Sequence, residues 1–350
     1  MIARLTVAVP FVMAVPDGAD FPLWSSEEDG YGVTLRPPVR SDVPLPSDAP
    51  AQVEIDGKRA YLANAVQIDF HKSAFDRSKG GPSDPPEALL RSTVTSLLAR
   101  LRYTTRATQI NAGEPLQGTS WRLEYLNDDG SELAPDPALM RARTSVARRA
   151  SFVAVSPAIW NAAHQLASAW ASPVWDDILL DASGALPSVG TAVVLGATAL
   201  EVFISHVLDG LAEAGRIPAD VWAWLNDRDN WLKEPSTEEQ FDVLLKHFTG
   251  HTLKDDRPLW QAFKELRTAR NTFVHQGRAT VGGVAITAER ASVLIRSAHQ
   301  IVQRVREWLP EDQRWPAHSV PVQTKFLVMG PLSKDGKPPD QWLLSDPPAG

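Results

Sequence analysis

The chain has 350 residues, of which 43% are hydrophobic, and this predicts two domains with sizeable cores of their own. It contains no cysteine, which excludes disulfides, a thiolate nucleophile and a zinc site built from cysteines, and which suits a cytoplasmic protein. The net charge of −7 argues against a protein that coats nucleic acid through bulk electrostatics.

Residues 1–150 predict an α+β domain. Leu5–Val7 and Tyr31–Leu35 alternate between apolar and polar residues as half-buried strands do, and residues 53–61 predict a hairpin around Asp56-Gly57. The first 15 residues resemble a signal peptide only superficially because Pro10 interrupts the apolar run, so we interpret them as a strand. No other apolar run is expected to approach the roughly 18 residues that a membrane span needs.

The rest of this half continues the pattern of strands with one helix. The proline-rich segment 36–50 predicts an extended loop, and residues 121–125 predict a strand. A helix is expected to start at Asp84-Pro85-Pro86-Glu87, with Leu90, Val94, Leu97, Leu98 and Leu101 on its apolar face. No catalytic motif occurs here, and we interpret the half as a sensing or docking domain.

Residues 151–312 predict an all-α domain. Helices are expected from Pro157 to about Trp170, from Trp175 to Asp181, from Ser188 to Leu211, from Ser236 to Phe248, from Leu259 to Gly277 and from Thr287 to Leu309. Four main helices with short connections imply an antiparallel bundle. Residues 313–350 are a proline-rich tail with one strand-like run, 320–329, which we expect to return to the sheet of the first domain or to cover an edge.

The helix that ends at Gly277 carries a charge within its apolar pattern. Leu259, Phe263, Leu266 and Phe273 fall on one stripe, and Arg270 falls in the middle of that stripe. An unpaired buried charge costs roughly several kcal/mol, so an arginine there needs a carboxylate, a subunit interface or a bound anion.

The surroundings of Arg270 add further polar groups. His275 is a side chain that changes its charge near neutral pH, and Asn271 adds a neutral donor and acceptor. Residues 151–250 hold 4 Lys or Arg against 13 Asp or Glu, whereas residues 251–300 hold 8 against 4. Lys264, Arg267 and Arg278 could therefore guide a phosphate backbone toward Arg270, or they could simply form a solvated helix face.

The string Arg270-Asn-Thr-Phe-Val-His275, after a helix that carries Ala199-Leu-Glu201, resembles the HEPN superfamily over about residues 151–310. The resemblance implies a homodimer that pairs the motif helices and forms a composite catalytic site from Arg270, Asn271 and His275 of both subunits. It implies an endoribonuclease that uses neither metal nor cofactor and leaves a 2′,3′-cyclic phosphate. HEPN ribonucleases are often toxins or phage-defence effectors, so a protein or ligand trigger would bind the first domain.

Glu201 is a supporting candidate because it interrupts a face of Leu, Val and Phe on the opposing helix, where a carboxylate would steady Arg270 or His275. The same residues allow a second interpretation, in which Arg270, Glu201 and His275 fix helix register or the dimer interface. The protein would then be a non-catalytic HEPN module for dimerisation and for binding a nucleotide or a partner, with a regulatory role. A third interpretation is a protein-binding regulator led by the first half.

Overall fold

The chain divides into two compact units. The computed structural model describes residues 1–45, 52–73, 75, 84–110, 120–131, 152–167, 170–226, 235–316 and 324–327. The first unit comprises residues 1–171 and 318–350, and the second comprises residues 172–317. The first domain was expected to end at residue 150. It ends at residue 171 instead, because helix α2 (Pro157–Gln165) belongs to the first unit. Trp160 of α2 is fully buried there, and its indole N–H donates to the carbonyl of Pro22 at 2.9 Å.

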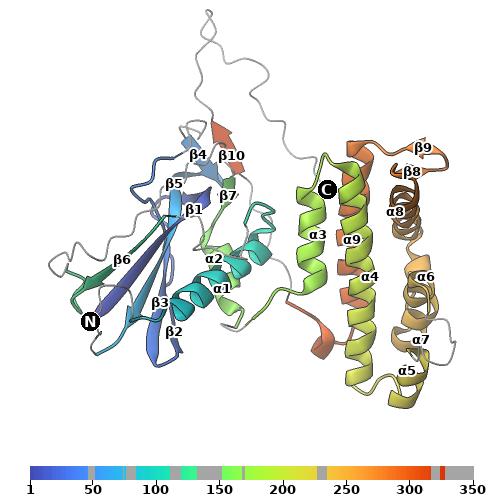
Figure 1. The fold of residues 1–350 in the computed structure, drawn as a ribbon, viewed down its shortest axis with the longest axis horizontal. Coiled ribbons are helices and arrows are strands. Elements are labelled where there is room, and N and C mark those ends of the chain that lie inside the picture. The colour runs from blue at the N-terminus through green and yellow to red at the C-terminus, as the bar shows by residue number, and fades with distance from the viewer. Residues whose placement is uncertain are drawn as a thin grey trace, which may run out of the picture. The chain divides into compact units, whose positions relative to one another are not determined.

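The first unit is built on two long antiparallel strands, β1 (Ile2–Pro16) and β5 (Lys58–His71). On the edge away from β1, β5 pairs antiparallel with β4 (Gln52–Ile55) and with β3 (Tyr31–Val39). Strand β3 also pairs with β2 (Trp24–Glu28). Along its other edge β1 pairs antiparallel with β6 (Trp121–Leu126) and parallel with β7 (Phe152–Ala154). The strands expected at Leu5–Val7, Tyr31–Leu35 and 121–125 are confirmed (Figure 1).

Local chemistry explains the turns and irregularities of this sheet. Asp56 and Gly57 take positive φ values of 50° and 74°, which is the geometry of the tight hairpin expected between β4 and β5. The pairing of β1 with β5 shifts register between Ala8 and Met13, the interval that contains Pro10, which has no N–H to donate. The N-terminal run is thus a strand, as predicted.

The extended loop expected from residue 36 is wrong at its start, because β3 continues to Val39. A register shift between Arg36 and Val39 leaves Pro37 and Pro38 outside the ladder. At the other end of the chain, β10 (Thr324–Leu327) pairs antiparallel with β4. The prediction that a strand of the tail returns to the first sheet is therefore confirmed, and the rest of the tail lies outside the described residues.

Helix α1 (Glu87–Thr105) packs with α2 and the sheet to close the core of the first unit. The predicted apolar residues of α1 are all buried: Leu90, Val94, Leu97, Leu98 and Leu101. They join the inward-facing residues of β1, β3 and β5 in one cluster. A sheet with helices on it agrees with the expected α+β class.

The second unit is a group of helices that lie side by side. Its long members are α3 (Val174–Gly184), α4 (Val189–Glu213), α8 (Arg257–Gln276) and α9 (Ala288–Trp308), and α4 contacts the other three (Figure 1). Shorter segments connect α4 to α8: α5 (Ala219–Leu225), α6 (Thr237–Glu239), a π-helical turn (Gln240–Leu244) and α7 (Leu245–Thr249). The capping box predicted at Ser236 and Glu239 is confirmed. A small hairpin of β8 (Thr280–Val281) and β9 (Val284–Ala285), which the sequence did not predict, joins α8 to α9.

Helix α4 is the most apolar helix of the second unit. Among the described residues it alone is long and apolar enough to cross a membrane by length and composition, with a mean hydropathy of 1.8. This corrects the expectation that no later run approaches that length. Its contacts with α3, α8 and α9 give a sufficient physical reason for the composition, since a helix enclosed by others is apolar on most sides.

Candidate functional site

Helix α8 carries the predicted motif and has well-defined ends. The Asp256 carboxylate accepts a hydrogen bond from the Leu259 N–H at 3.3 Å, which caps the first turn. At the other end Gly277 takes the left-handed conformation, with φ 70°, and its N–H donates to the carbonyl of Phe273. The predicted end of the helix is therefore confirmed.

Arg270 lies at the edge of the buried face of α8. The buried stripe runs through Leu259, Phe263, Leu266 and Ala269, whereas the side chain of Arg270 is 32% exposed. Arg270 was expected to face the core, and this expectation is wrong. The buried position is that of Ala269, one residue earlier.

The structure brings Arg270 together with two of the other predicted residues. Its Nη2 lies 3.8 Å from Oε2 of Glu201 on α4, and its Nη1 donates to Oδ1 of Asn271 at 3.0 Å. Its Nε is buried and has no acceptor in the described part of the chain. Because 3.8 Å is too long for a hydrogen bond, the ion pair leaves guanidinium donors unused.

Two glycines of α4 allow close approach of its neighbours, Gly190 to α8 and Gly196 to α9. A Cβ atom built on Gly190 would lie 2.0 Å from Cε2 of Phe273, and one on Gly196 would lie 2.4 Å from Cδ1 of Ile295. The Phe273 ring occupies the space that a side chain at residue 190 would need. The spacing of α4 from α8 therefore depends on glycine at residue 190, and its spacing from α9 depends on glycine at residue 196.

His275 does not join this group within one copy of the chain. It is exposed in the last turn of α8, five residues after Arg270. Five residues correspond to about 140° around a helix and about 7.5 Å along it, so the two side chains leave the helix in different directions. Val274, between them, is 55% exposed.

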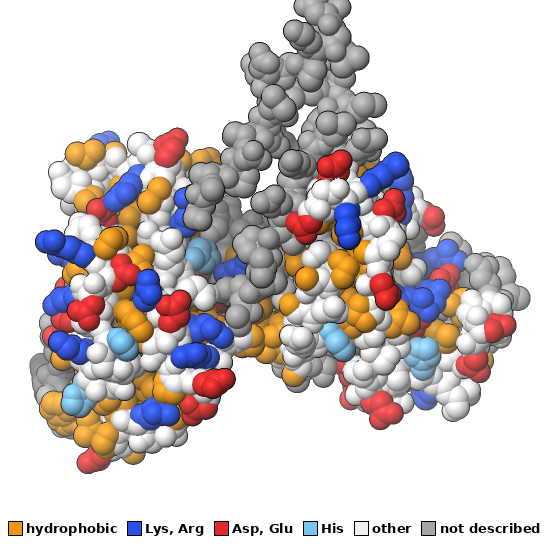
Figure 2. Space-filling model, turned by 180° about the vertical axis from the view of Figure 1, so that it is seen from behind, with side chains coloured by type: hydrophobic (Ala, Val, Ile, Leu, Met, Phe, Trp, Pro, Cys, Tyr) orange, Lys and Arg blue, Asp and Glu red, His pale blue; other side chains and the backbone are white. Residues whose placement is uncertain are grey.

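The predicted phosphate-guiding residues differ in their surroundings. Lys264 and Arg278 are exposed, whereas Nη1 of Arg267 pairs with Oε2 of Glu238 at 3.2 Å. On the face shown in Figure 2, basic and acidic side chains of the helical unit are interspersed, and its described residues form no continuous basic patch there. Bulk attraction for a polyanion is therefore weak on that face, and any phosphate contact depends on individual side chains.

A large cleft beside Glu201 was missed by the sequence reasoning. It has a volume of about 980 Å³ and is lined by Trp175, Glu201, His206, Asp209, Ser236 and other residues of α3, α4 and the loop before α6. These residues are distant in the sequence and carry no shared motif. The cleft places solvent-accessible space on one side of the Glu201 carboxylate while Arg270 lies within 4 Å of it.

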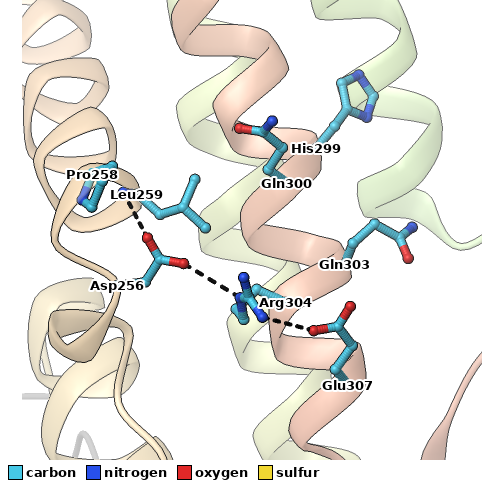
Figure 3. Close-up of a pocket in the computed structure, with 8 residues that line it drawn as sticks. All are labelled: Asp256, Pro258, Leu259, His299, Gln300, Gln303, Arg304 and Glu307. Carbon is cyan, nitrogen blue, oxygen red and sulfur yellow. Dashed lines mark hydrogen bonds and ion pairs between the residues drawn. The ribbon is translucent and has the colours of Figure 1, made fainter. Parts of the chain in front are cut away.

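A second cleft of about 490 Å³ lies between the start of α8 and the middle of α9. Figure 3 shows Arg304 between two carboxylates, and its distances are 3.3 Å to Asp256 and 3.0 Å to Glu307. His299 contacts Ser183, with Nε2 3.3 Å from Oγ. The Arg304 guanidinium is already balanced by these two carboxylates, so this cleft offers less for an anionic ligand than Arg270 does. Within the described residues no group of three His, Asp or Glu side chains is arranged to hold a metal ion.

No known protein family, no curated protein and no solved structure matches this chain.

Proposed function

We propose that the helical unit is a metal-independent endoribonuclease of the HEPN type, which acts as a homodimer with Arg270, Asn271 and His275 in its site. The observation that carries the proposal is the incomplete hydrogen bonding of the Arg270 guanidinium. The Arg270 side chain is one-third exposed, and its Nε is buried without an acceptor in the described part of the chain. Its other contacts are a hydrogen bond from Nη1 to Asn271 at 3.0 Å and a 3.8 Å ion pair with Glu201. Such a group is ready to take two oxygens of a phosphate, which is the recognition that arginine provides best.

RNA supplies its own nucleophile, and this defines what the residues must do. A histidine removes the proton from a 2′-hydroxyl, whose oxygen attacks the adjacent phosphorus. Arg270 stabilises the charge that builds up on the phosphorane oxygens. The 5′-oxygen leaves with a proton from a second acid, so the products are a 2′,3′-cyclic phosphate and a 5′-hydroxyl.

The reaction needs one base and one acid, and a single copy offers one His275. A two-fold axis beside the end of α8 would bring a second His275 to the same phosphate. The exposed Val274 supports this arrangement because a dimer contact would bury it. In this proposal Glu201 holds the guanidinium in the free protein and releases it to the substrate phosphate.

The proposal extends to biological role by analogy with HEPN ribonucleases. The protein is a toxin or phage-defence effector, and the first unit recognises the protein or ligand that triggers it. Lys264 and Arg278 contact the RNA backbone outside the site, while Arg267 does so only after it separates from Glu238.

The direct test is incubation of the protein with total RNA in EDTA. Wild type is expected to leave 2′,3′-cyclic phosphate ends, and both Arg270→Ala and His275→Ala are expected to reduce cleavage by about 10²-fold or more while remaining folded. Arg296→Ala is the matched control, since Arg296 is an exposed arginine on α9 with no role in the site. Equal cleavage by wild type and the two site variants would contradict the proposal.

The ion pair between Arg270 and Glu201 favours one alternative, a non-catalytic module in which this pair fixes the interface of a dimer. Because both side chains are about one-third exposed, the pair by itself is worth only about 0–1 kcal/mol to one chain. The alternative predicts that Glu201→Gln weakens the dimer, as measured by light scattering, in a protein without RNA cleavage. If Glu201→Gln changes neither stability nor cleavage, Glu201 has no part in either role.

A further inference from the structure

A small cavity in the first unit has the features of a ligand site. Its volume is about 180 Å³, and it lies between β2, β3, α1 and the end of α2. Its polar lining includes Ser26, Glu28, Thr93, Arg100 and His164, and Trp24 forms part of its aromatic wall. This cavity is independent of the Arg270 site, which belongs to the other unit.

Arg100 is a buried cation without a carboxylate partner. The residue is 5% exposed, its Nε donates to the carbonyl of Ser96 at 3.2 Å, and its guanidinium carbon lies 5.4 Å from the centre of the Trp24 ring. Within the described residues no carboxylate lies close enough to form an ion pair with it. Burial lowers the pKa of Arg100, and the opposing effect of the Glu28 charge is smaller. A guanidinium in this position is expensive unless an anionic group from outside the chain balances it.

Trp24 provides an independent sign of a missing acceptor. The residue is 2% exposed, and its buried indole N–H has no hydrogen-bond partner. Its ring is fixed by stacking on Trp160 at 4.3 Å and on His164 at 4.8 Å. Buried polar groups are nearly always satisfied in folded proteins, so the unpaired Trp24 N–H, on the same cavity as the buried Arg100 cation, indicates an acceptor that binds there.

Glu28 makes the cavity unlike a simple anion site. Its carboxylate accepts a hydrogen bond from Ser26 Oγ at 3.2 Å. Thr93 Oγ1, which donates to the carbonyl of Leu89 at 2.8 Å, lies 3.4 Å from the same carboxylate. The cavity therefore carries one positive and one negative group that do not neutralise each other directly. Burial and the nearby Arg100 lower the pKa of His164, which keeps that ring neutral at neutral pH. His164 therefore adds no charge to the cavity. A ligand with both charges matches this arrangement better than phosphate, which Glu28 would repel.

We propose that this cavity binds a small zwitterion of the α-amino acid class, with its carboxylate on Arg100 and the Trp24 N–H and its ammonium group on Glu28. The cavity volume of about 180 Å³ has room for a small amino acid. Val33 and Leu35, which also line the cavity, provide apolar contact for that side chain. The first unit would then recognise a metabolite.

The test is isothermal titration calorimetry on the full chain with L-alanine, L-serine and L-valine as probes. At least one of them is expected to bind saturably, and acetate, methylammonium and inorganic phosphate are expected to bind at least about tenfold more weakly, because each engages only one of the two charged walls. Binding of phosphate or acetate that equals the best amino acid would overturn the zwitterion assignment. Absence of saturable binding by all three amino acids at millimolar concentration would overturn the site.

Two variants test whether the amino acid binds in this cavity. Arg100→Met and Glu28→Gln are each expected to weaken the amino acid by about tenfold or more, since each removes a charge-assisted hydrogen bond. Arg91→Ala is the control, because Arg91 lies on the same helix but pairs with Glu87 outside the cavity. Glu28 is only partly buried, so Glu28→Gln keeps the test decisive if Arg100→Met fails to fold. Unchanged affinity in folded Glu28→Gln would overturn the proposal.

Discussion

Asp69 is the most strongly bonded charge of the first sheet. It is 1% exposed and accepts hydrogen bonds from Arg4 at 2.7 and 3.0 Å and from Arg36 at 2.6 Å. Burial by itself raises the pKa of Asp69, but the bonds from the two arginines outweigh burial and hold the pKa below its ordinary value. Three strands are joined through this one carboxylate, since Arg4, Arg36 and Asp69 come from β1, β3 and β5.

The lowered pKa of Asp69 predicts a pH-dependent stability. The ionised carboxylate contributes its full stability above the unfolded pKa of about 3.9, and that stability is lost as the pH falls through the lower folded pKa. Asp69→Asn is expected to cost about 3 kcal/mol at pH 7 and to flatten the dependence below pH 4. Hydrogen exchange of β1 and β5 between pH 7 and pH 3 measures both effects. Glu87→Gln, which breaks only the exposed pair with Arg91, should change stability by less than about 0.5 kcal/mol.

Individual residues show where sequence reasoning succeeds and where it ends. The pairing of Arg270 with Glu201 could be anticipated because each is a charge in the apolar pattern of a long helix. The pairing of Asp69 with Arg4 could not, since it depends on the register between strands 65 residues apart. No sequence pattern indicated that Arg100 would be buried. Its position among Leu97, Leu98 and Leu101 is buried only because α2 and β2 cover that side of α1.

At the scale of elements, Gly190 tests how α4 and α8 are spaced. Gly190→Ala would place a Cβ within the ring of Phe273, and we expect a loss of about 1–3 kcal/mol, reduced by the better helix propensity of alanine. Gly210→Ala on the same helix is the control, because its Cβ would meet only the flexible end of Gln313 at 3.3 Å. It should be neutral or stabilising. Urea unfolding measures both, and equal effects would show that the close approach at Gly190 is not required.

Elements with a strong local signal were predicted well. The capping box at Ser236, the glycine stop at Gly277 and the apolar stripe of α1 each act within a few residues, and all three are present. The assignment of α2 to the helical unit failed for a different reason. The helix itself was expected, but its apolar face around Trp160 fits either core, and only tertiary packing decides between them. Strand β7 is three residues long and has no pattern that could reveal it.

At the scale of the whole molecule, β10 covers the open edge of β4. Ending the chain after residue 317 would remove β10 and expose the unpaired N–H and C=O groups of residues 52–55. We expect faster hydrogen exchange in β4 and concentration-dependent association, with no change in α4, α8 and α9. A chain that ends after residue 327 keeps β10 and should behave like the full chain in β4. Identical exchange in the two shortened chains would contradict this role.

The return of β10 also sets the order in which the chain matures during synthesis. The ribosome makes residues 172–317 before it makes Thr324–Leu327, so the edge of β4 stays open while the whole helical unit emerges. Closing that edge joins segments about 270 residues apart, and the entropic cost of such a closure falls when the intervening chain is already folded. The unit that contains β4 therefore gains its last strand only after the helical unit has been synthesised.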